Sequence, residues 1–252
     1  MEWYIYPLVV LAGVLAGVIN TLAGSGSAIT LGVLLFLGLP ADMANGTNRV
    51  GVVALGLGSI SALKREQVMP LLGKAQYILW VTLAGALAGA MVVVEINEAA
   101  LEKVIGGFMI VLLFIILFNP KRWLQDSTQA LTRPTFWHIL LFFAVGFYGG
   151  FIQMGYGIFF LAVAVLVARF SLTDSNIIKI VGTFIFAIPV LGIFIWHGDV
   201  QWGLGLTLAL GQAIGGWLAA RYALGHPQAN IWIRRLLIVM ILVVIIKIFF
   251  FS

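Results

Sequence analysis

Arg49 and Lys179 are basic residues that lie well inside long apolar stretches of the sequence. A cation at the centre of a membrane helix costs about 2.5–3.5 kcal/mol, so each is a candidate for a functional role. Asp42 and Asp174 lie nearer the starts of the same stretches, where we expect them to cap helices rather than to form ion pairs. Unpaired cations beside a polar cavity would attract an anion. The alternative is that both long side chains extend to the membrane surface.

Two polar, glycine-rich breaks interrupt the apolar sequence. They are residues 20–27, Asn-Thr-Leu-Ala-Gly-Ser-Gly-Ser, and residues 153–157, Gln-Met-Gly-Tyr-Gly. A short helix that starts at such a break presents N–H donors and partial positive charge, so two of them converging would favour an anion. The hydroxyls of Ser25, Ser27 and Tyr156 would add donors. The alternative is that the glycines only allow tight turns between paired helices.

Further small polar residues accompany the two cations. Thr47 and Asn48 directly precede Arg49, and Thr183 follows Lys179 by one helical turn, so they would complete a hydrogen-bonding shell unless they only serve helix packing. The candidate substrate-binding residues are therefore Asn20, Thr21, Gly24, Ser25, Gly26, Ser27, Thr47, Asn48, Arg49, Gln153, Tyr156, Gly157, Lys179 and Thr183.

The composition places these residues in a membrane. Of 252 residues, 62% are hydrophobic and 9% are charged, against roughly 25% charged residues in a soluble domain. The mean hydropathy is +1.12. We therefore expect an integral membrane protein, with the lipid bilayer and a small anion as partners. The net charge of +5 includes no long basic run, so nucleic-acid binding is not expected, and a homodimer is left open.

Enzyme chemistry finds little support in the sequence. There is no cysteine, and His138, His197 and His226 lie too far apart to show metal-ligand spacing. The HExxH, GxSxG and P-loop motifs are absent. We therefore expect no catalytic residues, no metal and no cofactor.

Hydropathy predicts an all-α membrane protein of about ten segments. Their approximate ranges are 5–24, 26–38, 42–62, 76–95, 100–118, 136–154, 157–169, 174–196, 201–221 and 231–250. Segments 26–38 and 157–169 are short, since about 13 residues reach only about 20 Å of a 30 Å hydrocarbon core. Each of the two follows one of the polar breaks, so we expect short or broken helices there.

The two halves of the chain repeat. The matching positions are Gly13-x-x-x-Gly17 with Gly146-x-x-x-Gly150, Gly85-x-x-x-Gly89 with Gly211-x-x-x-Gly215, and Asn20 with Gln153. Close helix packing alone also accounts for such glycines. We predict a first membrane repeat at 1–118, a cytoplasmic linker at 119–135 and a second membrane repeat at 136–252.

Charges between the segments indicate the topology. Basic loops alternate with non-basic ones, which places the linker inside and both termini outside. Five segments per half is an odd number, so the halves would be inverted relative to each other, as in many secondary transporters with a substrate site at the repeat interface.

At these motifs the chain resembles the TauE/SafE family of membrane permeases, which are sulfite-exporter-like proteins. The resemblance rests on residues 17–26 (GVINTLAGSG), 39–41 (LPA), 44–48 (ANGTN) and 146–157 (GFYGGFIQMGYG). Ser25, Ser27 and the run 153–157 depart from the family's richer use of glycine. The resemblance implies a permease or exporter for sulfite or an organosulfonate in a bacterial-type plasma (inner) membrane, and the predicted inverted repeat favours alternating access. An anion channel or a non-transporting membrane subunit remains the alternative, and the direction and the coupling ion stay open.

Overall fold

The computed structural model describes residues 4–97, 99–101, 103–105, 107, 110 and 134–224, and in these ranges the regular structure is entirely helical. The elements in chain order are α1 (Ile5–Ala23), α2 (Ser27–Phe36), α3 (Ala41–Ala62), α4 (Arg65–Lys74), α5 (Gln76–Val93), α7 (Phe136–Phe151), α8 (Tyr156–Leu166), α9 (Leu172–His197), α10 (Trp202–Leu218) and the π-helical turn η2 (Ala219–Ala223).

Several of these helices have the length and apolar character of membrane spans. In the described part of the chain they are α1, α5, α9 and the continuous helix Trp202–Ala223, while α2, α7 and α8 are shorter apolar helices. The prediction of an all-α membrane protein is confirmed. Segment 231–250, most of segment 100–118 and nearly all of the linker 119–135 lie outside the described residues, so the count of ten and the inverted repeat stay predictions.

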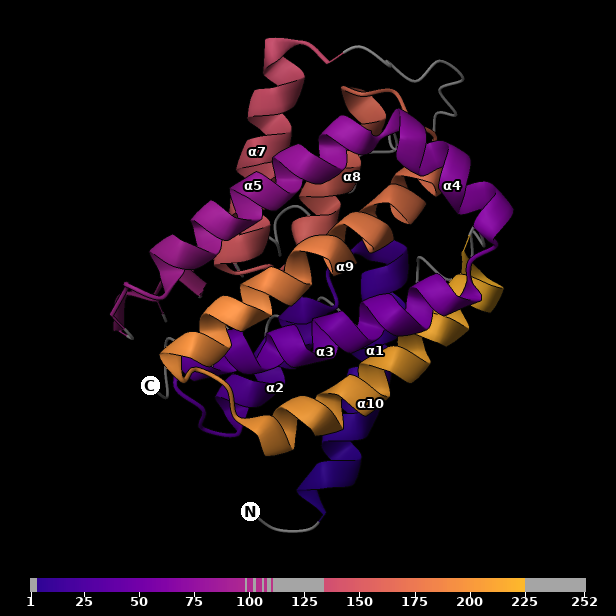
Figure 1. Cartoon of the computed structure of the whole chain (residues 1–252). Helices are drawn as coiled ribbons and strands as arrows, with labels where there is room; N and C mark the ends of the chain where they lie inside the picture. Colours follow the sequence, from indigo (N-terminus) through magenta and orange to yellow (C-terminus); the bar gives the residue numbers. More distant parts are fainter. Residues whose placement is uncertain are drawn as a thin grey trace.

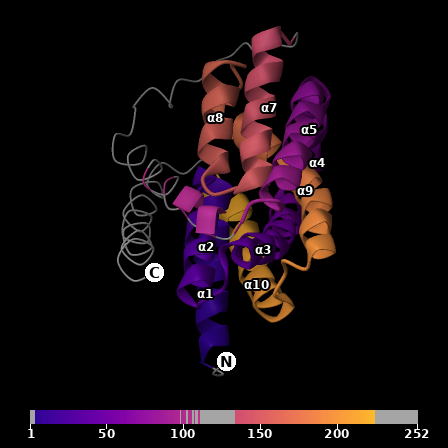
Figure 2. The ribbon, with the colours of Figure 1, turned by 90° about the vertical axis from the view of Figure 1, so that its left-hand side faces the viewer.

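The two polar breaks become the tips of two helical hairpins. Figure 2 shows α1 with α2 approaching from one end of the molecule and α7 with α8 from the other, so that the tips meet near its middle. There the N–H of Gly157 donates to the carbonyl of Gly24 at 3.0 Å. A Cβ on either glycine would collide with the backbone of the other. The alternative that these glycines only allow tight turns is therefore incomplete, because Gly24 and Gly157 also bring the two hairpins into contact.

The matched glycines lie where helices from the two halves of the chain cross (Figure 1). A Cβ at Gly13 or Gly17 of α1 would meet the backbone of α10, and a Cβ at Gly146 or Gly150 of α7 would meet the backbone of α5. Each glycine pair thus lets two helix backbones approach closely, as small residues do in membrane bundles. Close packing, the simpler interpretation of these glycines, is confirmed.

Two features of the helix starts and loops differ from expectation. Asp42 and Asp174 are not N-caps: Pro40 precedes α3, and the Oγ of Ser171 caps α9 by accepting from the N–H of Asp174 at 3.0 Å. Both carboxylates instead lie in the first helical turn, where negative charge is still favourable. The loop expected between segments 42–62 and 76–95 contains helix α4, whose Val68 packs against α9.

The turn between α9 and α10 packs on the start of α3. Gly198 ends α9 with φ of 82°, and the N–H of Gln201 donates to the Oγ1 of Thr47 at 2.8 Å. Partial burial raises the pKa of the neighbouring Asp199 carboxyl above its usual value, nearby Asp42 raises it further, and His197 partly opposes both effects.

Replacing Asp199 by Asn is expected to raise the melting temperature slightly at neutral pH. The pKa of Asp199 is higher in the folded protein than in the unfolded chain, so folding favours the protonated carboxyl. This contribution to stability is fully present below the unfolded-state pKa and is lost as the pH rises through the folded-state pKa. The gain stays well under about 1 kcal/mol since solvent screens a partly exposed carboxylate. Melting curves of the parent and variant in detergent, recorded from acid to neutral pH, should coincide in acid and separate as the pH rises. A constant difference across this range would contradict the assignment.

Candidate functional site

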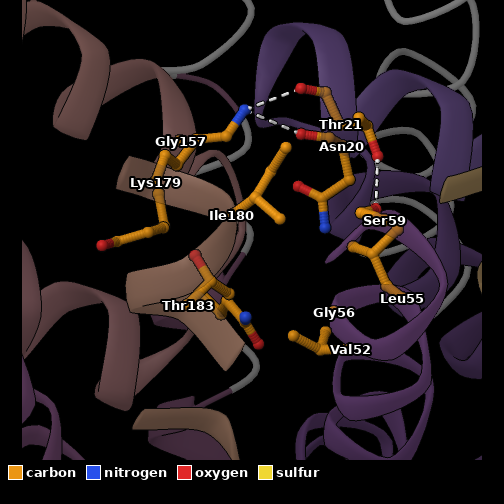
Figure 3. A pocket seen from close by; sticks show the side chains of 12 residues that line it. Asn20, Thr21, Val52, Leu55, Gly56, Ser59, Gly157, Lys179, Ile180 and Thr183 are labelled. Atoms are coloured by element: carbon orange, nitrogen blue, oxygen red, sulfur yellow. Dashed lines mark hydrogen bonds between the residues drawn. The ribbon is translucent and has the colours of Figure 1, made fainter. Parts of the chain in front are cut away.

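A small buried cavity lies where the two hairpin tips meet α3 and α9 (Figure 3). Its volume of about 20 Å³ is room for about one water molecule. Of the candidate residues, the cavity brings together Asn20, Thr21, Gln153, Tyr156, Gly157, Lys179 and Thr183. The others lie outside its lining: Gly24, Ser25, Gly26, Ser27, Thr47, Asn48 and Arg49.

Most of the candidates outside the lining are buried close behind it. The Nδ2 of Asn20 donates to the Oγ of Ser27 at 3.4 Å, and the Oγ1 of Thr30 donates to the Oδ1 of Asn48 at 2.5 Å. Gly26 allows α1 and the start of α2 to touch, because a Cβ there would meet the backbone of α1. Thr47 is the exception, since its hydroxyl accepts from the α9–α10 turn.

Lys179 of α9 closes the end of α1. Its Nζ donates to the carbonyls of Asn20 and Thr21, both at 3.0 Å, and to the Oδ1 of Asn176 at 2.8 Å. Figure 3 shows the two carbonyl contacts as dashed lines at the edge of the cavity. An ammonium group has three N–H donors, so all of them are used. A cation in this place is favourable because a helix C-terminus carries free carbonyls and partial negative charge.

Arg49 of α3 closes the end of α7 in the same way. Its Nη1 donates to the carbonyl of Gly149 at 2.6 Å and to the Oε1 of Gln153 at 2.9 Å. Its Nη2 donates to the carbonyl of Gly150 at 2.8 Å and to the Oδ1 of Asn45 at 3.1 Å. The guanidinium also lies over an aromatic ring of α9. Each cation therefore comes from one half of the chain and caps a broken helix of the other half.

These contacts correct two interpretations of the cations. Neither cation lacks a partner, since backbone carbonyls and amide oxygens surround both. Neither side chain extends to the membrane surface, because Arg49 is 0% exposed and Lys179 is 3% exposed. Sequence patterns could not indicate these partners, because every residue carries a carbonyl and only the fold decides which ones end a helix nearby.

The unpartnered polar atoms around the cavity are mainly hydrogen-bond donors. Among the described residues, Gln153 Nε2 is a buried atom without a partner that belongs to the lining, whereas Ser25 Oγ, Asn48 Nδ2 and Arg49 Nε also have no partner but lie outside the lining. The backbone N–H groups at the start of α8 do not add to them, because those of Tyr156, Gly157 and Ile158 donate to carbonyls. A buried donor without an acceptor costs about 1–3 kcal/mol, so the Gln153 amide suits a ligand that offers an acceptor.

Residues not identified from the sequence complete the lining. Ser59 of α3 is fully buried, and its Oγ lies 3.2 Å from the Oγ1 of Thr21. Val52, Leu55 and Gly56 of α3 and Ile180 of α9 supply the apolar wall. A serine inside an apolar segment was a signal for Ser59, whereas nothing distinguishes the apolar residues from ordinary packing.

A bundle of apolar helices whose broken hairpins meet at a buried polar cavity is typical of membrane transporters. The comparison with known proteins agrees with this class. The chain belongs to the TauE/SafE sulfite exporter family, whose pattern it matches over residues 9–248.

Curated relatives include a probable membrane transporter protein, ORF9, of Sinorhizobium sp, with 26% identity over 89% of this chain and 85% of that protein. A probable membrane transporter protein of Haemophilus influenzae shows 27% identity over 90% of this chain and 88% of its own length. Escherichia coli YfcA, also a probable membrane transporter protein, shows 27% identity over 85% and 79%. No solved structure matches the chain.

Proposed function

We propose that this protein carries a small sulfur oxyanion, sulfite or an organosulfonate, across a bacterial-type plasma membrane. The observation that supports this most directly is the unpartnered Gln153 Nε2 in the wall of a buried cavity that also contains Lys179. An amide N–H beside a positive charge favours an acceptor-rich anion. The family to which the chain belongs is named for sulfite export, which makes a sulfur oxyanion the first candidate.

The charge distribution around the cavity favours an anion over a cation. Lys179 is the charged residue in the lining, and no Asp or Glu is found among the lining residues in the described part of the chain. A cationic substrate would meet no compensating carboxylate in this wall.

The cavity volume favours alternating access. A sulfonate head group has several heavy atoms and needs more room than a cavity of about 20 Å³, so transport would require a second state in which the cavity is wider. The predicted inverted repeat supplies a route for opening, because α1 packs on α10 and α5 packs on α7 across the two halves. Rocking one such group of helices against the other would open the cavity first to one side and then to the other.

The membrane potential then favours export. An anion leaving a negative-inside cell gains about 2.3 kcal/mol per charge per 100 mV. Proton coupling usually uses an intramembrane carboxylate, and the described lining contains none. Efflux driven by the potential alone is therefore the simplest mechanism.

Reconstitution into proteoliposomes tests this mechanism. With sulfite or a small sulfonate on one side, an imposed potassium-diffusion potential should drive saturable anion flux without a proton or sodium gradient, and protein-free vesicles should show none. Flux that ignores the potential and requires a proton gradient would contradict the uniport. Flux that does not saturate would favour an anion channel, and no flux with any of these anions would favour a non-transporting subunit.

A further inference from the structure

Gln153 is held in an unusual backbone conformation at the tip of the α7–α8 hairpin. Its φ is 66°, a left-handed value that a residue with a side chain rarely adopts. Its N–H donates to the carbonyl of Tyr148 at 3.2 Å, and its carbonyl accepts from the N–H of Tyr156 at 3.0 Å. Such a conformation costs of order 1–3 kcal/mol and persists only where its surroundings hold it, often at a functional site.

The orientation of the Gln153 amide follows from the chemistry of Arg49. A guanidinium has only donors, so it can contact only the oxygen of a carboxamide. The Oε1 of Gln153 accepts from the Nη1 of Arg49 at 2.9 Å, and the Nε2 must then point elsewhere. Gln153 is 2% exposed and lines the cavity, whereas Arg49 does not line it. The nitrogen is therefore the end of the amide that remains free to donate to a ligand in the cavity.

We propose that Arg49 orients the amide of Gln153 so that its Nε2 donates a hydrogen bond to one oxygen of the bound anion. In this arrangement Gln153 touches the substrate, and Arg49 is a positioning residue that does not. The inference rests on the proposed function, because it names the contact that the anion makes in that cavity.

This orientation gives the site a chemical preference. The amide can donate to an acceptor, but it cannot turn to accept from a donor, because turning would place its NH₂ group against the Arg49 guanidinium. A sulfonate offers acceptor oxygens only. The corresponding sulfonamide replaces one oxygen by an NH₂ group and is neutral, so its two remaining oxygens accept a weaker hydrogen bond from the fixed donor than a sulfonate oxygen does.

Gln153→Glu is the decisive variant. A carboxylate keeps an acceptor for Arg49, so this contact and the fold should survive, but the cavity loses its donor and gains an oxygen. Binding of methanesulfonate and methanesulfonamide to the purified full-length protein would be measured by calorimetry. We expect the variant to lose about ten-fold to a hundred-fold in methanesulfonate affinity, and its preference for the sulfonate over the sulfonamide should fall.

Gln153→Glu adds a negative charge and also removes a hydrogen-bond donor, and two further variants distinguish these two effects. Asn45→Asp places the same new charge on the other amide that contacts Arg49, outside the cavity lining, where the Nδ2 of Asn45 donates to the carbonyl of Phe151 at 2.8 Å. It should keep most of the preference for the sulfonate. Gln153→Asn adds no charge, tolerates the left-handed backbone better, and is too short to reach both Arg49 and the anion. It should lose sulfonate affinity as Gln153→Glu does.

The outcomes distinguish this inference from the function on which it rests. If the parent protein binds methanesulfonate, and both Gln153 variants keep its affinity and preference, the positioning role is overturned and the proposed function stands. If Asn45→Asp loses as much as Gln153→Glu, charge alone explains the effect and the positioning role is again overturned. If the parent binds no sulfonate or sulfite at all, both proposals fail.

Discussion

Replacing Arg49 by Met is expected to destabilise the folded protein by at least about 4 kcal/mol. Four buried acceptors lose their donor: the carbonyls of Gly149 and Gly150 and the amide oxygens of Gln153 and Asn45. Each buried acceptor left without a partner costs about 1–3 kcal/mol, and methionine fills a similar volume without replacing any of these bonds. The carbonyls of Gly149 and Gly150 at the end of α7 would then lose this donor, and the α7–α8 hairpin should separate from α3.

Thermal unfolding in detergent measures this effect, with Arg221→Met as the matched control. Arg221 is exposed, and its guanidinium lies 5.9 Å from the ring centroid of Trp217. Its loss should change stability by no more than about 1 kcal/mol. An Arg49→Met protein that melts like the parent and has only lost anion binding would contradict the capping role. That result would favour instead the direct substrate contact expected from the sequence.

Replacing Gly157 by Ala is expected to prevent the two hairpin tips from meeting and to abolish transport. The added methyl would collide with the backbone of Gly24, where the hydrogen bond between the tips is 3.0 Å long. Overpacking a well-packed interior costs about 1–3 kcal/mol, and here the obstacle is a backbone that cannot change rotamer. Gly24→Ala should be at least as damaging, because Gly24 also has a φ of 75°.

Gly192→Ala is the control for this prediction, because Gly192 lies in α9 with open space where its Cβ would be placed. Folded yield, melting temperature and anion flux in proteoliposomes should stay close to the parent for Gly192→Ala and fall sharply for Gly157→Ala. Parent-like flux in Gly157→Ala would show that the contact between the tips is not needed for transport.

Most of the helices could be predicted because apolar runs are a local property of the sequence. The predicted segments 76–95 and 174–196 correspond to α5 (Gln76–Val93) and α9 (Leu172–His197) within a few residues. Helix α4 was not predicted because it is short, carries charged residues and is stabilised mainly by packing on α9. A hydropathy profile depends only on residues that are neighbours in the sequence, so it cannot predict that contact.

The sequence could predict a site residue only where an unusual residue type in a local stretch of sequence marks it. The polar breaks carry their own signal, and Asn20 and Gln153 do line the cavity. Thr47 was grouped with Arg49 because the two are close in sequence. Residues two apart on a helix, however, point about 200° away from each other. Arg49 therefore faces the end of α7, while Thr47 faces the α9–α10 turn.

Each half of the chain supplies the cation that caps a helix of the other half, and this has a consequence for the order of synthesis. The N–H of Gly24 already donates to the carbonyl of Asn20, whereas the carbonyl of Thr21 accepts from Lys179, which is 158 residues further along the chain. At roughly 5–20 residues per second, synthesis takes about ten to thirty seconds to supply that partner. During this time the carbonyl of Thr21 at the α1–α2 tip lacks this donor, which costs about 1–3 kcal/mol unless water or another protein supplies one. The first half of the chain therefore acquires its final hydrogen bonds only after the second half has been synthesised.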